Sequence, residues 1–279
     1  MNSINDSWLV GTSSGVYRPN TQGGWERLGA YPFRITAFDR TRERVLAATG
    51  SGLWEVREDR WVQRHDETLT EVLDVIDEGK TMIVGSAYGL AFGNTEASGR
   101  TVWRWLSDGL SVNQRFTNAI TKAGDRILVA TEDGVLIYAP DSTWCKSSLR
   151  GIPVRSLVSF GQAFYAGSDD GIWSSNDGQV WKRVSDRLPV HVLAAAGSLL
   201  LAGTENGVCV SDSGHDWQPA GLSSMRVSAV EADLSEAGHW VAGGSPGGLW
   251  VTKDSGKSWS GIPEIRSEVE AIIAPGAAS

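Results

Sequence analysis

Residues 128–138 read LVATEDGVLIY, and variants of this stretch return at six other places in the 279-residue chain. In most copies an apolar run leads into Thr or Ser, a short polar turn follows, and a glycine then precedes an aliphatic residue. Two β-rich runs on either side of a Gly-containing turn are typical of a β-hairpin. The seven hairpin glycines are Gly15, Gly52, Gly89, Gly134, Gly171, Gly207 and Gly248.

Two further elements flank each hairpin. A β-rich segment precedes it, and in five copies this segment begins seventeen positions before the glycine, at Ile35, Val72, Thr117, Val154 and Val190. A tryptophan that opens a short polar strand follows it, at Trp25, Trp61, Trp103, Trp144, Trp181, Trp217 and Trp259. Each unit of roughly forty residues therefore contains four strands, which is the period of a propeller blade.

The two ends of the sequence complement each other. The first unit begins at its second strand, SWLVG (7–11), whereas the chain ends on a lone first strand, SEVEAIIAPG (267–276). We expect the last strand to complete the first blade, because a closed ring leaves no open sheet edge. The sequence thus predicts an all-β fold, a single seven-bladed β-propeller domain that spans residues 1–279.

The composition narrows the classes of function. The formal net charge of −8 opposes binding to nucleic acids, which needs clustered positive charge, and docking on anionic membranes. The sequence also has no leader-like or membrane-spanning apolar segment. We therefore expect a cytoplasmic protein, monomeric by default, without a cofactor and without a nucleic-acid or membrane partner. We also predict no metal site, because these residues fall at separate positions without ligand spacing: Cys145, Cys209, His65, His215 and His239.

Residues 252–259, TKDSGKSW, fit the pattern S/T-x-D-x-G-x-S/T-W, and SSNDGQVW (174–181) and VSDSGHDW (210–217) fit it in part. With these stretches the sequence resembles the BNR or Asp-box repeat family, which includes sialidases, sortilin-type receptors and a photosystem-assembly factor. An Asp side chain in such a turn accepts backbone N–H bonds, and the glycine permits a positive φ. We expect these structural roles for Asn176, Gly178, Trp181, Asp212, Gly214, Trp217, Thr252, Asp254, Gly256 and Trp259.

The resemblance also implies where function lies, since Asp-box turns in that family occupy the face opposite the functional site. The site would then be the channel mouth, the face where the hairpin turns and the connections between blades meet. The hairpin turns carry acidic residues, which either form a rim for a cationic ligand or simply suit tight turns. These residues are Glu132, Asp133, Asp169, Asp170 and Glu205, with Asn206 beside the last.

The second residue of each first strand is more informative, because it is mostly polar among apolar neighbours. It is Thr36, Leu73, Asn118, Arg155, His191, Ser228 or Glu270. Innermost strands crowd the axis, so bulky polar side chains fit only where the channel widens at its mouth. The predicted binding residues there are Arg34, Glu71, Arg115, Asn118, Arg155, His191, Arg226 and Glu270. The alternative is that such side chains only form cross-blade hydrogen bonds.

The longest connection on this face, LSDGLSVNQRF (106–116), is the expected specificity loop. Three classes of function remain open. The first is a binding propeller that presents its channel mouth to a protein, a peptide or a small polar ligand. The second is an enzyme of the glycosidase or lyase type, in which His191 acts as general acid or base, Glu270 assists it and Arg155 holds a substrate carboxylate. The third is a structural subunit of a larger assembly.

Sialidase activity is not expected. YPFRI (31–35) resembles the F/Y-R-I-P element of sialidases, with Arg34 in the position that clamps a carboxylate. However, Thr36 replaces the proline, and sialidases of that family have six blades where this sequence predicts seven.

Overall fold

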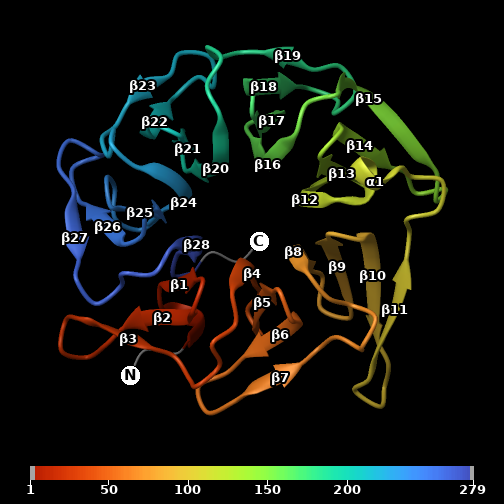
Figure 1. Ribbon diagram of the computed structural model, residues 1–279, viewed down its shortest axis with the longest axis horizontal. Coiled ribbons are helices and arrows are strands. Elements are labelled where there is room, and N and C mark those ends of the chain that lie inside the picture. Colours follow the sequence, from red (N-terminus) through yellow and green to blue (C-terminus); the bar gives the residue numbers. More distant parts are fainter. Residues whose placement is uncertain (1–3, 277–279) are drawn as a thin grey trace.

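The computed structural model describes residues 4–276 and shows a ring of seven four-stranded antiparallel blades around a central channel (Figure 1). The predicted all-β, seven-bladed propeller is therefore confirmed. Helical structure is confined to the 3-10 helix η1 (Ile4–Asp6) and to α1 (Val112–Arg115) in the described part of the chain. No helix within residues 4–276 is long and apolar enough to cross a membrane.

The blades are numbered along the chain, and their strands are given from the channel outward. Blade 1 contains β28 (Val269–Ile273), β1 (Leu9–Thr12), β2 (Gly15–Pro19) and β3 (Trp25–Arg27). Blade 2 contains β4 (Ile35–Arg40), β5 (Val45–Thr49), β6 (Gly52–Val56) and β7 (Trp61–Gln63). Blade 3 contains β8 (Val72–Asp77), β9 (Thr81–Ser86), β10 (Gly89–Thr95) and β11 (Thr101–Trp105). Blade 4 contains β12 (Thr117–Ala123), β13 (Arg126–Thr131), β14 (Gly134–Tyr138) and β15 (Trp144–Arg150).

The remaining blades follow the same order. Blade 5 contains β16 (Val154–Phe160), β17 (Ala163–Ser168), β18 (Gly171–Ser175) and β19 (Lys182–Arg183). Blade 6 contains β20 (Val190–Ala196), β21 (Leu199–Thr204), β22 (Gly207–Ser211) and β23 (Gln218–Pro219). Blade 7 contains β24 (Arg226–Ala232), β25 (Trp240–Ser245), β26 (Leu249–Thr252) and β27 (Ser260–Ile262).

The two ends of the chain meet in blade 1, as the sequence predicts. β28 pairs antiparallel with β1, with Leu9 opposite Ile273. The last strand thereby becomes the innermost strand of the first blade, and the ring closes.

A buried arginine fastens this closure. Arg40, the last residue of β4, is 1% exposed, and its guanidinium donates hydrogen bonds to the backbone carbonyls of Ile4, Ser7 and Ala274. The first of these residues precedes β1 and the last follows β28. One side chain of blade 2 therefore holds the segments on both sides of the closure.

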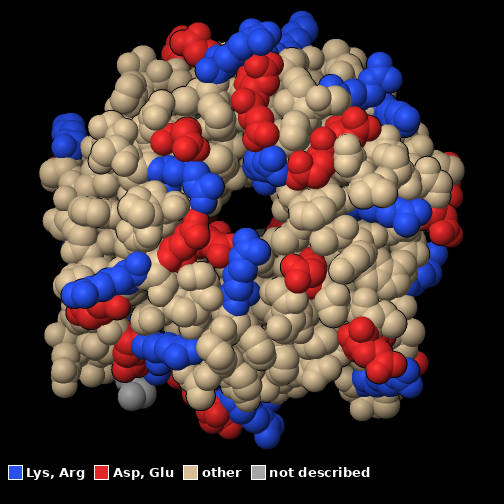
Figure 2. Space-filling model, in the orientation of Figure 1, with Lys and Arg blue, Asp and Glu red and all other residues tan. Residues whose placement is uncertain are grey.

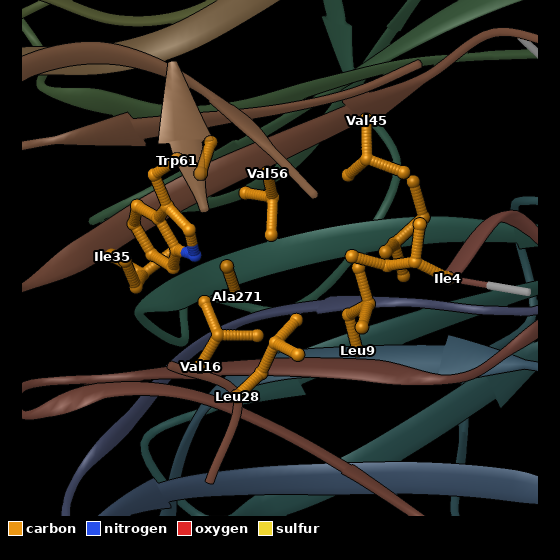
Figure 3. Packing of buried hydrophobic residues seen from close by; sticks show 11 residues of the cluster. Ile4, Leu9, Val16, Leu28, Ile35, Val45, Val56, Trp61 and Ala271 are labelled. Atoms are coloured by element: carbon orange, nitrogen blue, oxygen red, sulfur yellow. The ribbon is translucent and has the colours of Figure 1, made fainter. Parts of the chain in front are cut away.

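The hydrophobic core lies in layers between neighbouring blades. Figure 3 shows the layer between blades 1 and 2. Side chains of a strand point alternately to the two faces of its sheet, and all five residues of β5 are buried because neighbouring blades cover both faces. The layer comprises Ile4, Leu9, Val16, Leu28, Ile35, Val45, Ala47, Val56, Trp61, Ala271 and Ile273.

The hairpin turns depend on the Thr or Ser of the repeated pattern. In blade 4, Thr131 Oγ1 donates to the carbonyl of Gly134 at 3.0 Å and accepts from the N–H of Asp133 at 3.0 Å. Gly134 has φ +106°, and a Cβ there would lie 2.0 Å from the carbonyl oxygen of Leu149, so only glycine fits. The same hydroxyl-to-carbonyl bond occurs at Thr12, Thr49, Ser168 and Thr204.

The intact Asp-box stabilises the turn between β26 and β27 on the rear face, opposite the channel mouth. Asp254 accepts hydrogen bonds from Ser258 Oγ at 2.6 Å, Ser258 N at 2.9 Å and Thr252 Oγ1 at 2.7 Å. These bonds, led by the one from the Ser258 hydroxyl, lower the pKa of Asp254 to about 2. Trp259 Nε1 donates to the carbonyl of Ala220 at 2.8 Å, which joins the turn to blade 6.

The two weaker Asp-box copies use different residues from those the pattern indicated. In 174–181 the acceptor is Asp177 rather than Asn176, and it binds two backbone N–H groups at 2.8 and 2.9 Å. In 210–217 the acceptor is Ser213 rather than Asp212, with two backbone N–H groups at 3.2 Å. Both corrections have one cause, which is a shift of the motif by one residue. The hydroxyl that accepts the glycine N–H in each turn belongs to Ser175 and to Ser211, whereas the pattern indicated positions 174 and 210.

Candidate functional site

A β-bulge lies at the start of the innermost strand in all seven blades. In β16, for example, the register with the neighbouring strand skips the residue between Val154 and Ser156. A bulge leaves one residue unpaired and re-aims its side chain. The bulged residues are Thr36, Leu73, Asn118, Arg155, His191, Ser228 and Glu270. They are the positions that the sequence distinguished by their polarity.

Three bulged side chains connect their blade to the next one. Thr36, Asn118 and Ser228 each donate to the backbone carbonyl of the first residue of the next innermost strand, at 2.6, 2.9 and 2.7 Å. At these positions the structure shows the cross-blade hydrogen bonds that the sequence left as an alternative.

Glu270 and Arg34 form an extensive ion pair at the channel mouth. Arg34 Nε donates to the two carboxylate oxygens of Glu270 at 2.9 and 2.8 Å, and Arg34 NH2 lies 2.7 Å from Oε2. The hydrogen bond that Arg34 donates to Glu270 raises the pKa of Arg34, even though burial opposes it. The pair joins blade 1 to blade 2, and the Glu270 side chain is only 14% exposed.

Beside this pair lies a cavity of about 440 Å³ that receives side chains from blades 1, 2, 6 and 7. Its lining residues are Ser13, Arg34, His191, Arg226, Ser228, Glu268 and Glu270. Arg226 NH2 lies 2.6 Å from Glu268 Oε1. His191 Nε2 lies 2.9 Å from Glu205 Oε2, a residue of the hairpin turn in blade 6. The cavity therefore combines two guanidinium groups, two carboxylates and one imidazole.

Arg155 belongs to a second charged cluster, on blades 4 and 5. It pairs with Glu132 and, at 3.2 Å, with Asp169, and Asn118 Nδ2 also donates to Glu132 at 2.9 Å. Burial lowers the pKa of Arg155, but its contacts with Asp169 and Glu132 outweigh this effect and raise it. Figure 2 shows that basic and acidic side chains alternate around the opening of the channel.

The structure thus divides the residues that the sequence grouped into one site. His191 and Glu270 line the same cavity, whereas Arg155 lies outside the set of residues that line it. Glu71 also lies outside that set, although its charge contributes to the raised pKa of Arg34. Arg115 has a local contact, because its Nε donates to the carbonyl of Leu110 at 3.0 Å.

The long connection 106–116 contains α1, and at its start the N–H of Ser111 donates to Gln114 Oε1 at 3.2 Å. Gln114 Nε2 donates to Asp133 Oδ2 at 2.9 Å, so the connection is held on the hairpin turn of blade 4. Val112, on the outer side of α1, is 82% exposed.

Three residues of the cavity lining were not among the predicted binding residues: Ser13, Ser228 and Glu268. Glu268 lies two positions before Glu270, just ahead of β28, and the alternation of side chains along an extended segment was the signal that could have found it. Ser13 lies in the hairpin turn of blade 1, and its N–H donates to the carbonyl of Glu268 at 3.0 Å.

The rear face holds a group that the sequence did not reveal. Asp233, Glu236 and His239 lie in the turn between β24 and β25, and one possible ligand atom of each lies within 4.8 Å of the others. The sequence suggests that His239 is an isolated residue, whereas two carboxylates lie beside it.

Comparison with known proteins supports the fold and leaves the function open. Residues 100–234 match the family model described as DUF6242 beta propeller domain. No curated protein matches the sequence.

Solved structures share the propeller at low sequence identity. The extracellular domain assigned to a hybrid two-component system of B. thetaiotaomicron superimposes with a TM-score of 0.69 and 20% identity, over 93% of this chain and 37% of that chain. A protein from Lactobacillus plantarum gives 0.68 and 16%, over 96% and 99% of the two chains. The GH74 xyloglucanase from Xanthomonas campestris gives 0.62 and 16%, over 91% and 46%. The chain thus spans less than half the length of the first and third of these proteins, and the likeness shows the fold.

Proposed function

We propose that this propeller is a binding module whose channel-mouth cavity holds a small polar ligand that carries both a positive and a negative group. The observation that carries the proposal is the convergence of side chains from four blades on one cavity of about 440 Å³. That volume lies in the range of small-molecule sites, which are roughly 300–1,000 Å³.

The chemistry of the lining favours a zwitterion such as an amino acid or a short peptide. The two guanidinium groups of Arg34 and Arg226 face a ligand carboxylate, and the carboxylates of Glu268 and Glu270 face a ligand ammonium group. Each of these groups already has a partner of opposite charge in the protein. A ligand with both charges can replace both members of such an ion pair as partners, so that every charged group keeps a partner of opposite sign. A ligand with charge of only one sign would leave one member of the pair without a partner.

The proposal can be tested by thermal unfolding of the full chain in the presence of amino acids, dipeptides, polyamines, monosaccharides and sugar acids. A ligand at one hundred times its Kd stabilises the fold by about 2.7 kcal/mol, or roughly 5–10 °C in Tm. We expect zwitterions to raise the Tm of the wild type and to have little effect on Arg226→Met.

The matched control is Arg187→Met. Arg187 is an exposed arginine that is paired with Asp170 and is not part of the cavity lining. A panel in which no zwitterion shifts the Tm, or in which Arg226→Met responds as fully as Arg187→Met, would overturn the proposal.

A glycosidase is the second candidate, because Glu268 and Glu270 line the same cavity and two carboxylates are the usual catalytic set for glycoside hydrolysis. The similarity to a GH74 xyloglucanase points the same way. Binding is favoured over catalysis because both carboxylates are ion-paired, Glu270 with Arg34 and Glu268 with Arg226, whereas one of the two must carry a proton as the general acid. Turnover of xyloglucan or another glucan that disappears in Glu270→Gln would reverse this preference.

The intact Asp-box at 252–259 also supports kinship with BNR repeat proteins. We propose this relation on the turn geometry alone.

A further inference from the structure

The turn between β24 and β25 folds three potential metal ligands onto one another. Asp233 Oδ2 lies 3.6 Å from His239 Nδ1, and Glu236 Oε2 lies 3.1 Å from the same nitrogen. Asp233 Oδ1 is occupied, because it accepts hydrogen bonds from the N–H and the hydroxyl of Ser235 at 2.8 and 2.5 Å. One oxygen of each carboxylate therefore remains directed at the imidazole.

The imidazole nitrogen is buried without a hydrogen bond. His239 Nδ1 has almost no solvent contact, and neither carboxylate oxygen meets the geometry of a hydrogen bond to it. A buried polar atom normally has a partner, because leaving it unpaired costs about 1–3 kcal/mol. A nitrogen that faces two carboxylate oxygens without bonding to either one is suited to a cation that lies between all three groups.

The two distances to His239 Nδ1 fit a small divalent ion, and the two carboxylate oxygens lie within 4.8 Å of each other. Zn²⁺ binds His nitrogen and carboxylate oxygen at about 2.0–2.2 Å, so tetrahedral ligands lie roughly 3.4 Å apart. The two measured separations from His239 Nδ1, 3.1 and 3.6 Å, fall on either side of this value. A Ca²⁺ site would require six to eight oxygen ligands, with contacts of about 2.3–2.6 Å.

The surroundings leave room for a fourth ligand. Asp233 also lines a cavity of about 400 Å³, together with Asp6, Glu26 and Trp8. The Trp8 ring packs against the His239 ring at a centroid distance of 5.6 Å, which fixes the orientation of the imidazole. A water molecule or an anionic ligand can reach an ion at the edge of this cavity.

We propose that Asp233, Glu236 and His239 form a binding site for a divalent transition-metal ion of the Zn²⁺ class, on the rear face of blade 7. The ion would lie between the two carboxylates and the imidazole and form one coordinate bond with each of them. It lies beside the junction of blades 7 and 1, because Trp8 directly precedes β1. This site is independent of the channel mouth and of the ligand proposed there.

The test is calorimetric titration of Zn²⁺ into the 279-residue chain after removal of metal with EDTA. We expect one ion per chain, and an affinity at least tenfold lower in Glu236→Gln, in Asp233→Asn and in His239→Gln. Asp233→Asn retains an oxygen for the bonds from Ser235, and Glu236 is more than half exposed, so these two variants test the ligands even if His239→Gln is unstable.

Glu43→Gln is the matched control, since Glu43 is an exposed acidic residue in the equivalent turn of blade 2. Titration with Co²⁺ adds an optical readout, because four-coordinate Co²⁺ absorbs visible light more strongly than the hydrated ion. An absence of stoichiometric binding would overturn the proposal. Binding that is equal in the ligand variants and in Glu43→Gln would also overturn it, because the ion would then bind elsewhere.

Discussion

Replacement of Arg40 by methionine tests how the ring is closed. The guanidinium is 1% exposed and donates to three backbone carbonyls, those of Ile4, Ser7 and Ala274. Methionine fills a similar volume, so the cavity contribution is small. The change therefore isolates the charge and its hydrogen bonds, which act on the segments at both ends of the chain.

Two opposing free energies decide the outcome. Burial lowers the pKa of Arg40 to about 10 from 12.5, which at 1.36 kcal/mol for each pH unit corresponds to a cost of roughly 3 kcal/mol. Three hydrogen bonds from a charged donor contribute about 1.5–3 kcal/mol each, or between roughly 4 and 9 kcal/mol together. The bonds outweigh the cost of burial, so we expect Arg40→Met to reduce the free energy of unfolding by about 3 kcal/mol.

Urea unfolding with linear extrapolation measures this difference, and calorimetry should show a Tm lower by roughly 6–12 °C. Arg42→Met serves as the control, because Arg42 is an exposed arginine in the turn that follows β4, two positions after Arg40. A variant as stable as the wild type, or more stable, would refute the reasoning. It would mean that desolvation of the guanidinium dominates, as occurs when some buried ion pairs are replaced by apolar residues.

Three other predictions concern single interactions. Burial raises the pKa of Glu231 from 4.5 to about 7, so between these pH values the folded state holds a proton that the unfolded state has lost, and stability falls as the pH rises. Urea unfolding midpoints should therefore show Glu231→Gln equal to the wild type near pH 4 and more stable than the wild type at pH 8. Equal midpoints at pH 8 would contradict this. Thr131→Val should lower the free energy of unfolding in urea by about 1–3 kcal/mol, because it removes the hydrogen bond to Gly134 and leaves buried groups unpaired. Thr131→Ser keeps the hydroxyl and should be close to neutral, and a neutral Thr131→Val would count against the role of the hydroxyl. Trp259→Phe should lower stability by about 1 kcal/mol through loss of the bond to Ala220, and an unchanged calorimetric Tm would show that ring packing alone matters.

The number of blades and the closure of the ring were predictable because their signals are local and repeated. A hairpin turn needs a hydroxyl such as that of Thr131 and a glycine such as Gly134 with positive φ, and these requirements leave the same letters in the sequence at every blade. The mostly polar position near the start of each innermost strand was also visible in the sequence. It occupies a bulge, where its side chain is released from the pairing that constrains its neighbours.

Details of the rear-face turns were less predictable. Asp177 rather than Asn176 accepts the turn hydrogen bonds, because the capping hydroxyl is one residue later than the pattern indicated and the whole motif is shifted with it. The sequence of this segment is compatible with both alignments of the motif. The grouping of Asp233, Glu236 and His239 depends on the path of a seven-residue turn, which leaves no periodic signal in the sequence.

The sequence by itself determined the repeating strands, the ring and the face on which polar residues of the innermost strands gather, since each of these follows from spacing within one unit. Only the tertiary structure decided which of those residues act together. Arg34 and Glu270 are 236 positions apart and meet because ring closure brings blade 1 beside blade 2. Arg155 and His191 lie on adjacent blades, yet each pairs with a different hairpin turn, Arg155 with Glu132 and His191 with Glu205. Ion pairs between blades depend on the angle and distance between whole sheets, and no local pattern records these quantities.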